Sequence, residues 1–199
     1  MKIIVVGATG TIGKAVVAAL SGDHEIIKVG SKSGDAQVDI KDSASIRKLF
    51  DKVGKFDALI STVGKVHFGE FAKLTEKEVE IGLKDKLMGQ VNLVLIGRDY
   101  ANDGASFTLT TGLLNHDPIR YGACASLVNG ALDAFVKAAA IELPRGLRIN
   151  SVSPGVLEES LSSYGPYFKG HEAVPAKRVA QAYVKSVEGL LTGQVISVL

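Results

Sequence analysis

The first residues that could do chemistry are three glycines near the start of the chain, in the segment VVGATGTIGKAV. They follow an apolar, β-branched run and precede residues whose apolar positions recur every three or four, as on one face of a helix. Gly7 would allow a sharp exit from the strand, Gly10 a close backbone approach to a pyrophosphate, and Gly13 close packing of the helix on the sheet. Free N–H groups and the positive end of the helix dipole would then hold the phosphates. The turn predicts a dinucleotide-binding site, with a tight turn that binds nothing as the alternative, and its candidate residues are Gly7, Thr9, Gly10, Thr11, Ile12 and Gly13.

The segment after the second predicted strand, VGSKSGD, indicates which dinucleotide is bound. Ser31, Lys32 and Ser33 stand where an acidic residue would hold the ribose hydroxyls of NAD. Lys32 could neutralise the additional phosphate of NADP, and the two serines could donate hydrogen bonds to it. Asp35 lies nearby, and a solvated loop is the plainer explanation of these residues. The segment favours NADP, with NAD as the alternative.

The elements that must position these residues alternate between short apolar runs and longer helical patterns. Such alternation is typical of parallel strands with helices on both faces. The sequence therefore predicts an α/β, Rossmann-like doubly wound parallel sheet, formed by residues 1–199 as a single domain. The predicted strands are 2–7, 25–30, 36–40, 56–62, 105–112, 147–155 and 192–199. The predicted helices are one from residue 11, one at 43–54 after a serine cap, one at 75–98 with a capping box, and those at 118–143 and 175–191.

The composition is that of a soluble globular protein, with 46% hydrophobic and 22% charged residues. A net charge of +2 without any Lys/Arg run argues against nucleic acid and anionic membranes as partners. The longest apolar stretch carries Asn129, Asp133 and Lys137 at intervals of four, a polar stripe that argues against a membrane span. The single cysteine, Cys124, fits a reducing cytosol, so we expect a cytoplasmic protein. The histidines lack metal-ligand spacing, and no metal is expected.

Several segments, in chain order, resemble those of the short-chain dehydrogenase/reductase family. VDIKD resembles the family's third-strand segment, in which Asp39 would contact the adenine and Ile40 would line its pocket. STVG stands where the family has Asn-Ala-Gly, RINSVSPG closely resembles the segment beside the nicotinamide, and TGQVISVL resembles the final strand. The resemblance covers nearly the whole chain. It adds the coenzyme-binding candidates Asp39, Ile40, Ser61, Thr62, Val63, Gly64, Pro154, Gly155 and Val156.

The chain also departs from the family's pattern. The spacing Gly-x-x-Gly-x-x-Gly differs from the commoner Gly-x-x-x-Gly-x-Gly and is closer to the extended and atypical branches. The stretch from Gly30 to Asp39 leaves little room for a second helix, and the substrate loop after Gly155 is short. That loop, residues 157–174, is the expected lid, and its aromatic side chains suggest a modestly hydrophobic ligand.

The resemblance implies a catalytic group in which one member is missing. The family uses a serine after strand five, a Tyr-x-x-x-Lys pair and an asparagine on helix four. Here Thr111, or else Thr110, would take the serine's place and Tyr121 the tyrosine's, which puts Ala125 at the lysine position. Alanine cannot stabilise a phenolate. Lys86 stands at the asparagine position, as the lysine does in ketoreductase domains of polyketide and fatty-acid synthases, and could supply the charge; a solvated lysine is the alternative.

These residues predict an NADP-dependent oxidoreductase that transfers hydride between the nicotinamide and a small carbonyl or alcohol substrate. Tyr121 would give the proton, a threonine would polarise the oxygen, and Lys86 would tune Tyr121 and bind ribose. The alternative is an NADP(H)-binding sensor or scaffold protein with little or no catalysis, and a sugar-nucleotide epimerase is a third, suggested only by the glycine spacing. Because family members usually pair through helices four and five, the resemblance also implies a homodimer or homotetramer.

Overall fold

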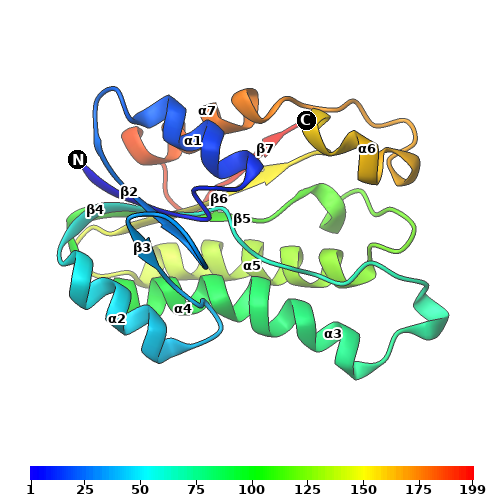
Figure 1. Ribbon diagram of the computed structural model, residues 1–199, viewed down its shortest axis with the longest axis horizontal. Helices are drawn as coiled ribbons and strands as arrows, with labels where there is room; N and C mark the ends of the chain where they lie inside the picture. The colour runs from blue at the N-terminus through cyan, green and yellow to red at the C-terminus, as the bar shows by residue number, and fades with distance from the viewer.

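The computed structural model describes residues 1–199 and shows a seven-stranded sheet between two layers of helices (Figure 1). All neighbouring strands are parallel, in the order β3-β2-β1-β4-β5-β6-β7. This confirms the predicted Rossmann-like, doubly wound fold. The strands are β1 (Lys2–Val6), β2 (Glu25–Gly30), β3 (Ala36–Gln37), β4 (Phe56–Ser61), β5 (Ala101–Thr110), β6 (Arg148–Pro154) and β7 (Val195–Val198).

The two faces of the sheet carry separate hydrophobic cores, because successive side chains of a strand point to opposite faces. In β1, Ile4 and Val6 pack into one core, and Ile3 and Val5 pack into the other. The helices α2 (Ser43–Val53), α4 (Met88–Gly97) and α5 (Ala123–Glu142) cover the first face, and α1 (Thr11–Leu20) and α7 (Ala176–Glu188) cover the second (Figure 1). Strands buried on both faces explain the continuous apolar runs of the sequence.

The stretch from Gly30 to Asp39 is as short as the sequence suggested, since no helix separates β2 from β3. β3 is shorter than expected and contains only Ala36–Gln37. The predicted serine cap of α2 is wrong: Ser43 is already helical, and the carboxylate of Asp42 accepts the hydrogen bond from Ala44 N at 2.9 Å. The predicted capping box between Thr75 and Glu78 is confirmed at the start of α3 (Glu76–Gly82).

The helix predicted from residue 75 onward is interrupted by a π-helical turn, Leu83–Leu87, between α3 and α4. A π-helical turn holds more residues than an α-helical one, so it changes which side chains face the sheet. Lys86 lies within this turn.

The long helix α5 begins at Ala123, five residues later than predicted. Tyr121 has a φ of 70°, in the left-handed region, which a right-handed helix cannot contain. Pro118 also disfavours helical backbone at the residue before it. The segment from Pro118 to Gly122 therefore forms a turn, with Gly122 N bonded to Ile119 O at 3.1 Å.

By length and mean hydropathy (1.4), α5 is also the one helix that could cross a membrane. Its predicted polar stripe is only partly exposed, because Asn129 and Asp133 are buried and Lys137 is exposed. The two buried side chains bind neighbouring loop and strand residues, as the core helix of a globular protein does.

Candidate functional site

The predicted coenzyme-binding residues gather at the carboxyl ends of β1, β2 and β4. A cavity of about 390 Å³ there, which we call the coenzyme pocket, contains both the glycine turn and the serine–lysine segment. Carboxyl ends of strands in an open α/β sheet are where nucleotides bind. The predicted residues that line it are Gly7, Thr9, Ser31, Lys32, Asp39, Ile40, Val63 and Gly64.

The glycine turn has the shape that a pyrophosphate needs. Gly7 has a φ of 86°, a left-handed conformation that favours glycine. A β-carbon at Gly13 would collide with the carbonyl oxygen of Gly7, so only glycine lets α1 lie this close to the turn. Gly10 caps α1 with no side-chain hydrogen bond, which leaves the first N–H groups of the helix available to a phosphate. These features fit a dinucleotide.

The charges around the pocket suit an additional phosphate. Three lysines line the pocket, Lys32 and also Lys41 and Lys65, which the sequence did not single out, against two carboxylates, Asp39 and Asp85. Asp35, the residue that argued for NAD, lies outside the lining, and its carboxylate accepts a hydrogen bond from Lys28 N at 2.8 Å. The end of β2 therefore presents a cation and no carboxylate to the pocket.

A second cavity of about 290 Å³, the inner cleft, adjoins the coenzyme pocket and shares Val63 and Gly64 with it. Of the predicted residues, Ile12, Thr62, Lys86, Thr110, Thr111, Pro154, Gly155 and Val156 also line the inner cleft. Residues of the expected lid close it, including Leu157, Tyr164 and Phe168. The short helix α6 (Leu161–Tyr164) belongs to this lid, whose ends are joined by a bridge between Leu157 and Val174.

Five predicted coenzyme-binding residues line neither cavity directly: Gly10, Thr11, Gly13, Ser33 and Ser61. The first three belong to the turn and helix start that shape the coenzyme pocket, and Ser33 lies on an exposed turn. Ser61 is also outside both linings, because its side chain is fully buried. Its carbonyl oxygen instead holds the end of β5 by accepting a hydrogen bond from Thr110 Oγ1.

Lys86 lines the inner cleft, as a functional role for this lysine requires, and is not a fully solvated surface residue. Its Nζ donates a hydrogen bond to the carbonyl oxygen of Thr111 at 2.8 Å. Its stem lies against Gly64, where any β-carbon would collide with it. Burial lowers the pKa of Lys86 from its ordinary value of 10.5 to about 8, and the negative charge of Asp133 opposes that shift.

Tyr121 is not among the residues that line this cleft, and no hydrogen bond joins it to Lys86, so the expected partnership is not formed in the structure. The Tyr121 ring packs edge-on against Tyr167, with ring centroids 5.7 Å apart, and beneath the Arg120 guanidinium at 4.7 Å. It borders separate surface hollows on the outer side of the loop that precedes α5. The turn at Pro118–Gly122 causes this placement, because it carries Tyr121 off the start of the helix.

The α5 residues that do line the inner cleft are Ala125 and Asn129. They are four positions apart, the spacing of the Tyr-x-x-x-Lys pair, so they occupy successive turns on the side of the helix facing the cleft. Asn129 is 2% exposed and donates from Nδ2 to the carbonyl oxygen of Gly112 at 3.1 Å. Its Oδ1 is buried without a partner. The sequence showed Asn129 only as part of a polar stripe.

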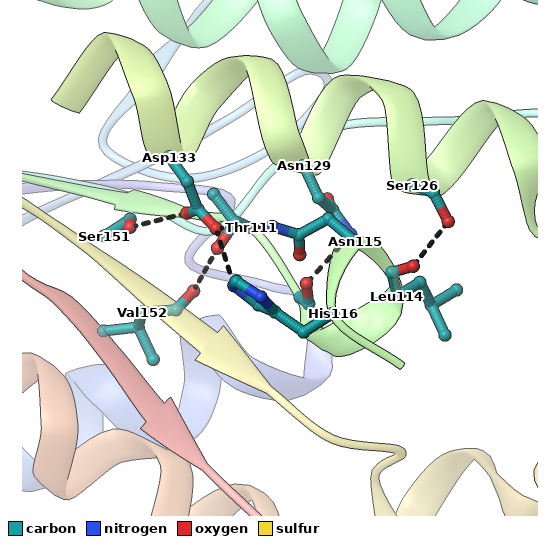
Figure 2. A network of polar contacts seen from close by, with 10 residues as sticks. Thr111, Leu114, Asn115, His116, Ser126, Asn129, Asp133, Ser151 and Val152 are labelled. Atoms are coloured by element: carbon teal, nitrogen blue, oxygen red, sulfur yellow. Dashed lines mark hydrogen bonds and ion pairs between the residues drawn. The ribbon is translucent and has the colours of Figure 1, made fainter. Parts of the chain in front are cut away.

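The two threonines at the end of β5 play different parts. Thr110 Oγ1 lies 2.5 Å from Ser61 O and 2.6 Å from the Tyr183 hydroxyl, so this hydroxyl is used up inside the fold. Thr110 as the substrate-polarising hydroxyl is therefore a wrong expectation. Thr111 Oγ1 has only a long contact of 3.5 Å, to Val152 O, and its hydroxyl keeps hydrogen-bonding capacity (Figure 2).

A buried polar network supports this side of the cleft. Figure 2 shows Ser126, Asn129 and Asp133 projecting from α5 toward the segment that follows β5. Asp133 accepts hydrogen bonds from Asn115 Nδ2 at 2.8 Å and Ser151 Oγ at 3.0 Å. The network ties α5 to β6 and to the loop after β5, and it fixes Asn129 beside Thr111. No group of three or more histidine, cysteine, aspartate or glutamate side chains is arranged to hold a metal ion.

Comparisons with known proteins agree with this geometry. A family model described as enoyl-(acyl carrier protein) reductase matches residues 11–188. The chain belongs to the short-chain dehydrogenase/reductase family. The crystal structure of the protein lin1944 from Listeria innocua is 49% identical, covers the whole of both chains and superposes with a TM-score of 0.98.

Other members of the family are more distant. A small-chain dehydrogenase crystallised in complex with NADPH is 25% identical, with a TM-score of 0.88, over 100% of this chain and 96% of its own. Glucose and ribitol dehydrogenase homolog 2 of Arabidopsis thaliana is 23% identical over 170 residues, which is 76% of this chain and 57% of the relative. The chain thus spans little more than half the length of that relative.

Proposed function

We propose that this member of the short-chain dehydrogenase/reductase family is an NADP(H)-dependent oxidoreductase for a small carbonyl compound or the corresponding alcohol. The observation that carries the proposal is the coenzyme pocket, where the glycine turn meets Lys32 and no carboxylate takes the place that suits NAD. The complex of a 25% identical relative with NADPH supports the same coenzyme.

In this proposal the glycine turn and the start of α1 hold the pyrophosphate. Ser31 and Lys32, which line the pocket, hold the additional phosphate, and Ser33 would reach it from the adjoining exposed turn. The segment Pro154–Val156 and Ile12 line the inner cleft, so the nicotinamide end would lie there beside Thr111 and Lys86. The bound coenzyme supplies hydride chemistry, and the protein supplies its position and the electrostatics around the substrate. The proposed compartment is a reducing cytoplasm, where the buried thiol of Cys124 stays free.

Replacing Lys32 by alanine tests the coenzyme. We expect the dissociation constant for NADPH to rise about tenfold, because a charge-assisted hydrogen bond is worth about 1.5–3 kcal/mol. The dissociation constant for NADH should barely change. Fluorescence titration measures both, and Lys177→Ala, which removes an exposed lysine on α7 outside the pocket, is the control. Equal affinity of the unmodified protein for NADH and NADPH would contradict the NADP assignment.

A sensor or scaffold protein is the second candidate function. The position of Tyr121 outside the inner cleft favours it, since no phenol on α5 faces the substrate. Such a protein would bind NADPH tightly and would leave it unoxidised with every member of a panel of small aldehydes and ketones. Oxidation of NADPH by any of them would exclude this candidate.

We also propose a homodimer or homotetramer that pairs through α4 and α5. Both helices expose large apolar side chains at spacings that put them on one side of each helix: Met88 and Leu95 on α4, and Leu127 and Ile141 on α5. Leu127→Glu is expected to give a monomer in light scattering coupled to size-exclusion chromatography. Leu190→Glu, a change at a residue exposed beyond α7, should leave the oligomer intact. A monomeric unmodified protein would contradict this assembly.

A further inference from the structure

The inner cleft combines apolar walls with one charge. Its walls include Val63, Val66, Phe68, Leu113 and Leu114, and Lys86 carries the only formal charge among the residues that line it. A half-buried ammonium is costly unless something polar compensates it. The cleft therefore holds a single positive charge, and the protein supplies only part of the hydrogen bonding that would offset the cost of burying it.

Lys86 is held in place without being neutralised. Its one hydrogen bond within the protein goes to Thr111 O, whereas an ammonium can donate three. Lys84, two positions earlier on the opposite side of the helix, forms an ion pair with Glu80 at 2.5 Å, whereas Lys86 in the cleft has no carboxylate partner. Two donor positions of Lys86 remain for a ligand.

Asn129 adds the complementary group. Its buried Oδ1 has no partner, and a buried amide oxygen is normally satisfied. Lys86 and Asn129 together offer a charged donor and a neutral acceptor in one cleft. A hydroxyl group accepts from the first and donates to the second, and a carbonyl or carboxylate oxygen accepts from the first.

The other polar side chains of the cleft are poorer candidates for binding that oxygen. Tyr164 comes from the lid, is 41% exposed and packs its ring against Phe68, with centroids 5.6 Å apart. Tyr121 faces a different hollow, and the Thr110 hydroxyl already has two partners. Thr62 Oγ1 already donates to backbone oxygens of the first turn, so Thr111 Oγ1 and the Ser160 hydroxyl remain as additional neutral hydrogen-bonding groups.

We infer that Lys86 Nζ binds the substrate oxygen and gives it its proton, and that the substrate is a carbonyl compound with an apolar body. This inference rests on the proposed function for the proton transfer but not for the binding. When bound, the reduced coenzyme would supply hydride, so that one of its C–H bonds breaks and it is oxidised as the new C–H bond forms at the carbonyl carbon. The π pair of the carbonyl moves to oxygen, an N–H bond of Lys86 breaks and an O–H bond forms. The resulting neutral amine then takes a proton from water.

The charged groups near Lys86 are compatible with its losing a proton to the substrate and regaining one from water. A group with a pKa near the working pH is both a sufficient acid and easily reprotonated, and Lys86 meets that condition better than an ordinary lysine. Asp133 on α5 is the charge that acts on it, and His116 lies 3.7 Å beyond Asp133. On its own turn, Asp85 accepts a hydrogen bond from Lys65 N. Tyr164 is the titratable group on the lid.

Hexanoate, an apolar chain with an anionic oxygen end, tests the binding without turnover. Calorimetry at pH 7 should show binding that weakens about tenfold by pH 9.5, because Lys86 loses its proton while hexanoate stays ionised. Lys86→Met should weaken binding at pH 7 by a similar factor and remove the pH dependence. Lys86→Arg should bind equally at both pH values. Lys84→Met, a change at an exposed lysine outside the cleft, should bind hexanoate like the unmodified protein.

Hexanal with NADPH tests the proton transfer. Lys86→Met should lower kcat by about a hundredfold or more, in the range of general acid catalysis, while its NADPH affinity stays within about threefold. Undetectable hexanoate binding, or equal binding by the unmodified protein and Lys86→Met, would overturn the binding role, and equal kcat would overturn the proton transfer. Hexanoate binding that follows Lys86, without any oxidation of NADPH by hexanal, would contradict the proposed function and leave Lys86 as a binding group only.

Discussion

Replacing Gly13 by alanine is expected to weaken NADPH binding by about a hundredfold and to lower the free energy of unfolding by about 1–3 kcal/mol. The added methyl group would collide with the carbonyl oxygen of Gly7 and with Cα of Ala8. Both belong to backbone that cannot rotate away, so α1 must move off the turn. The N–H groups at the start of α1 would then no longer converge on the pyrophosphate.

Gly22→Ala is the matched control, because a β-carbon at Gly22 would meet nothing within 4 Å. Fluorescence titration with NADPH and chemical denaturation measure the two effects separately. If Gly13→Ala bound NADPH as well as Gly22→Ala did, the pyrophosphate could not rest on this turn, and the coenzyme pocket would lose its assignment.

The fold was predictable from the sequence because its signals are local. The apolar run before Gly7 and the run before Gly30 each end where the structure ends a strand, within one residue. The glycines of the first turn are needed for steric reasons, because a dinucleotide-binding sheet requires a tight turn and a helix packed close to it. Alternation of strand and helix then restricts the topology to a few forms.

The catalytic arrangement was less predictable, because it depends on the phase of two helices. A tyrosine near the start of a predicted helix invites alignment on Tyr121, but one residue in the left-handed region moves the helix start past it. Ala125 and Asn129, one turn later, have the same spacing and face the cleft. Likewise, Lys84 and Lys86 are two positions apart and therefore lie on opposite sides of the helix, but the sequence does not say which of the two faces the cleft.

The polar residues of α5 show the same limit. Asn129 and Asp133 stood out in the sequence as a stripe on an apolar helix, which is compatible with exposure or with buried hydrogen bonds. Their partners, Gly112, Asn115 and Ser151, come from the loop after β5 and from β6. Only the tertiary structure brings these segments together, so the sequence could not assign the stripe to the cleft.

Replacing Lys86 by methionine is expected to stabilise the protein at pH 7 by up to about 3 kcal/mol. Burial lowers the pKa of Lys86 to about 8 in the folded state, from 10.5 when it is exposed. Below pH 8 both states carry the charge, and the folded protein bears the full cost of burying it. Between pH 8 and 10.5 the folded protein releases this proton before the unfolded chain does, so the unmodified protein gains stability as pH rises.

The advantage of Lys86→Met should therefore be greatest at pH 7 and nearly absent near pH 10.5. Urea denaturation of both proteins between pH 7 and 10.5 measures the difference in their free energies of unfolding. The contributions of all other titrating groups cancel in that difference. Lys84→Met should show no such trend, because Lys84 is an exposed lysine. If methionine stabilises the protein at this position, the buried lysine lowers stability. Its presence would then be explained by a role in binding or catalysis. A Lys86→Met protein that is less stable at pH 7 would mean that Lys86 is a structural residue, held for its bond to Thr111.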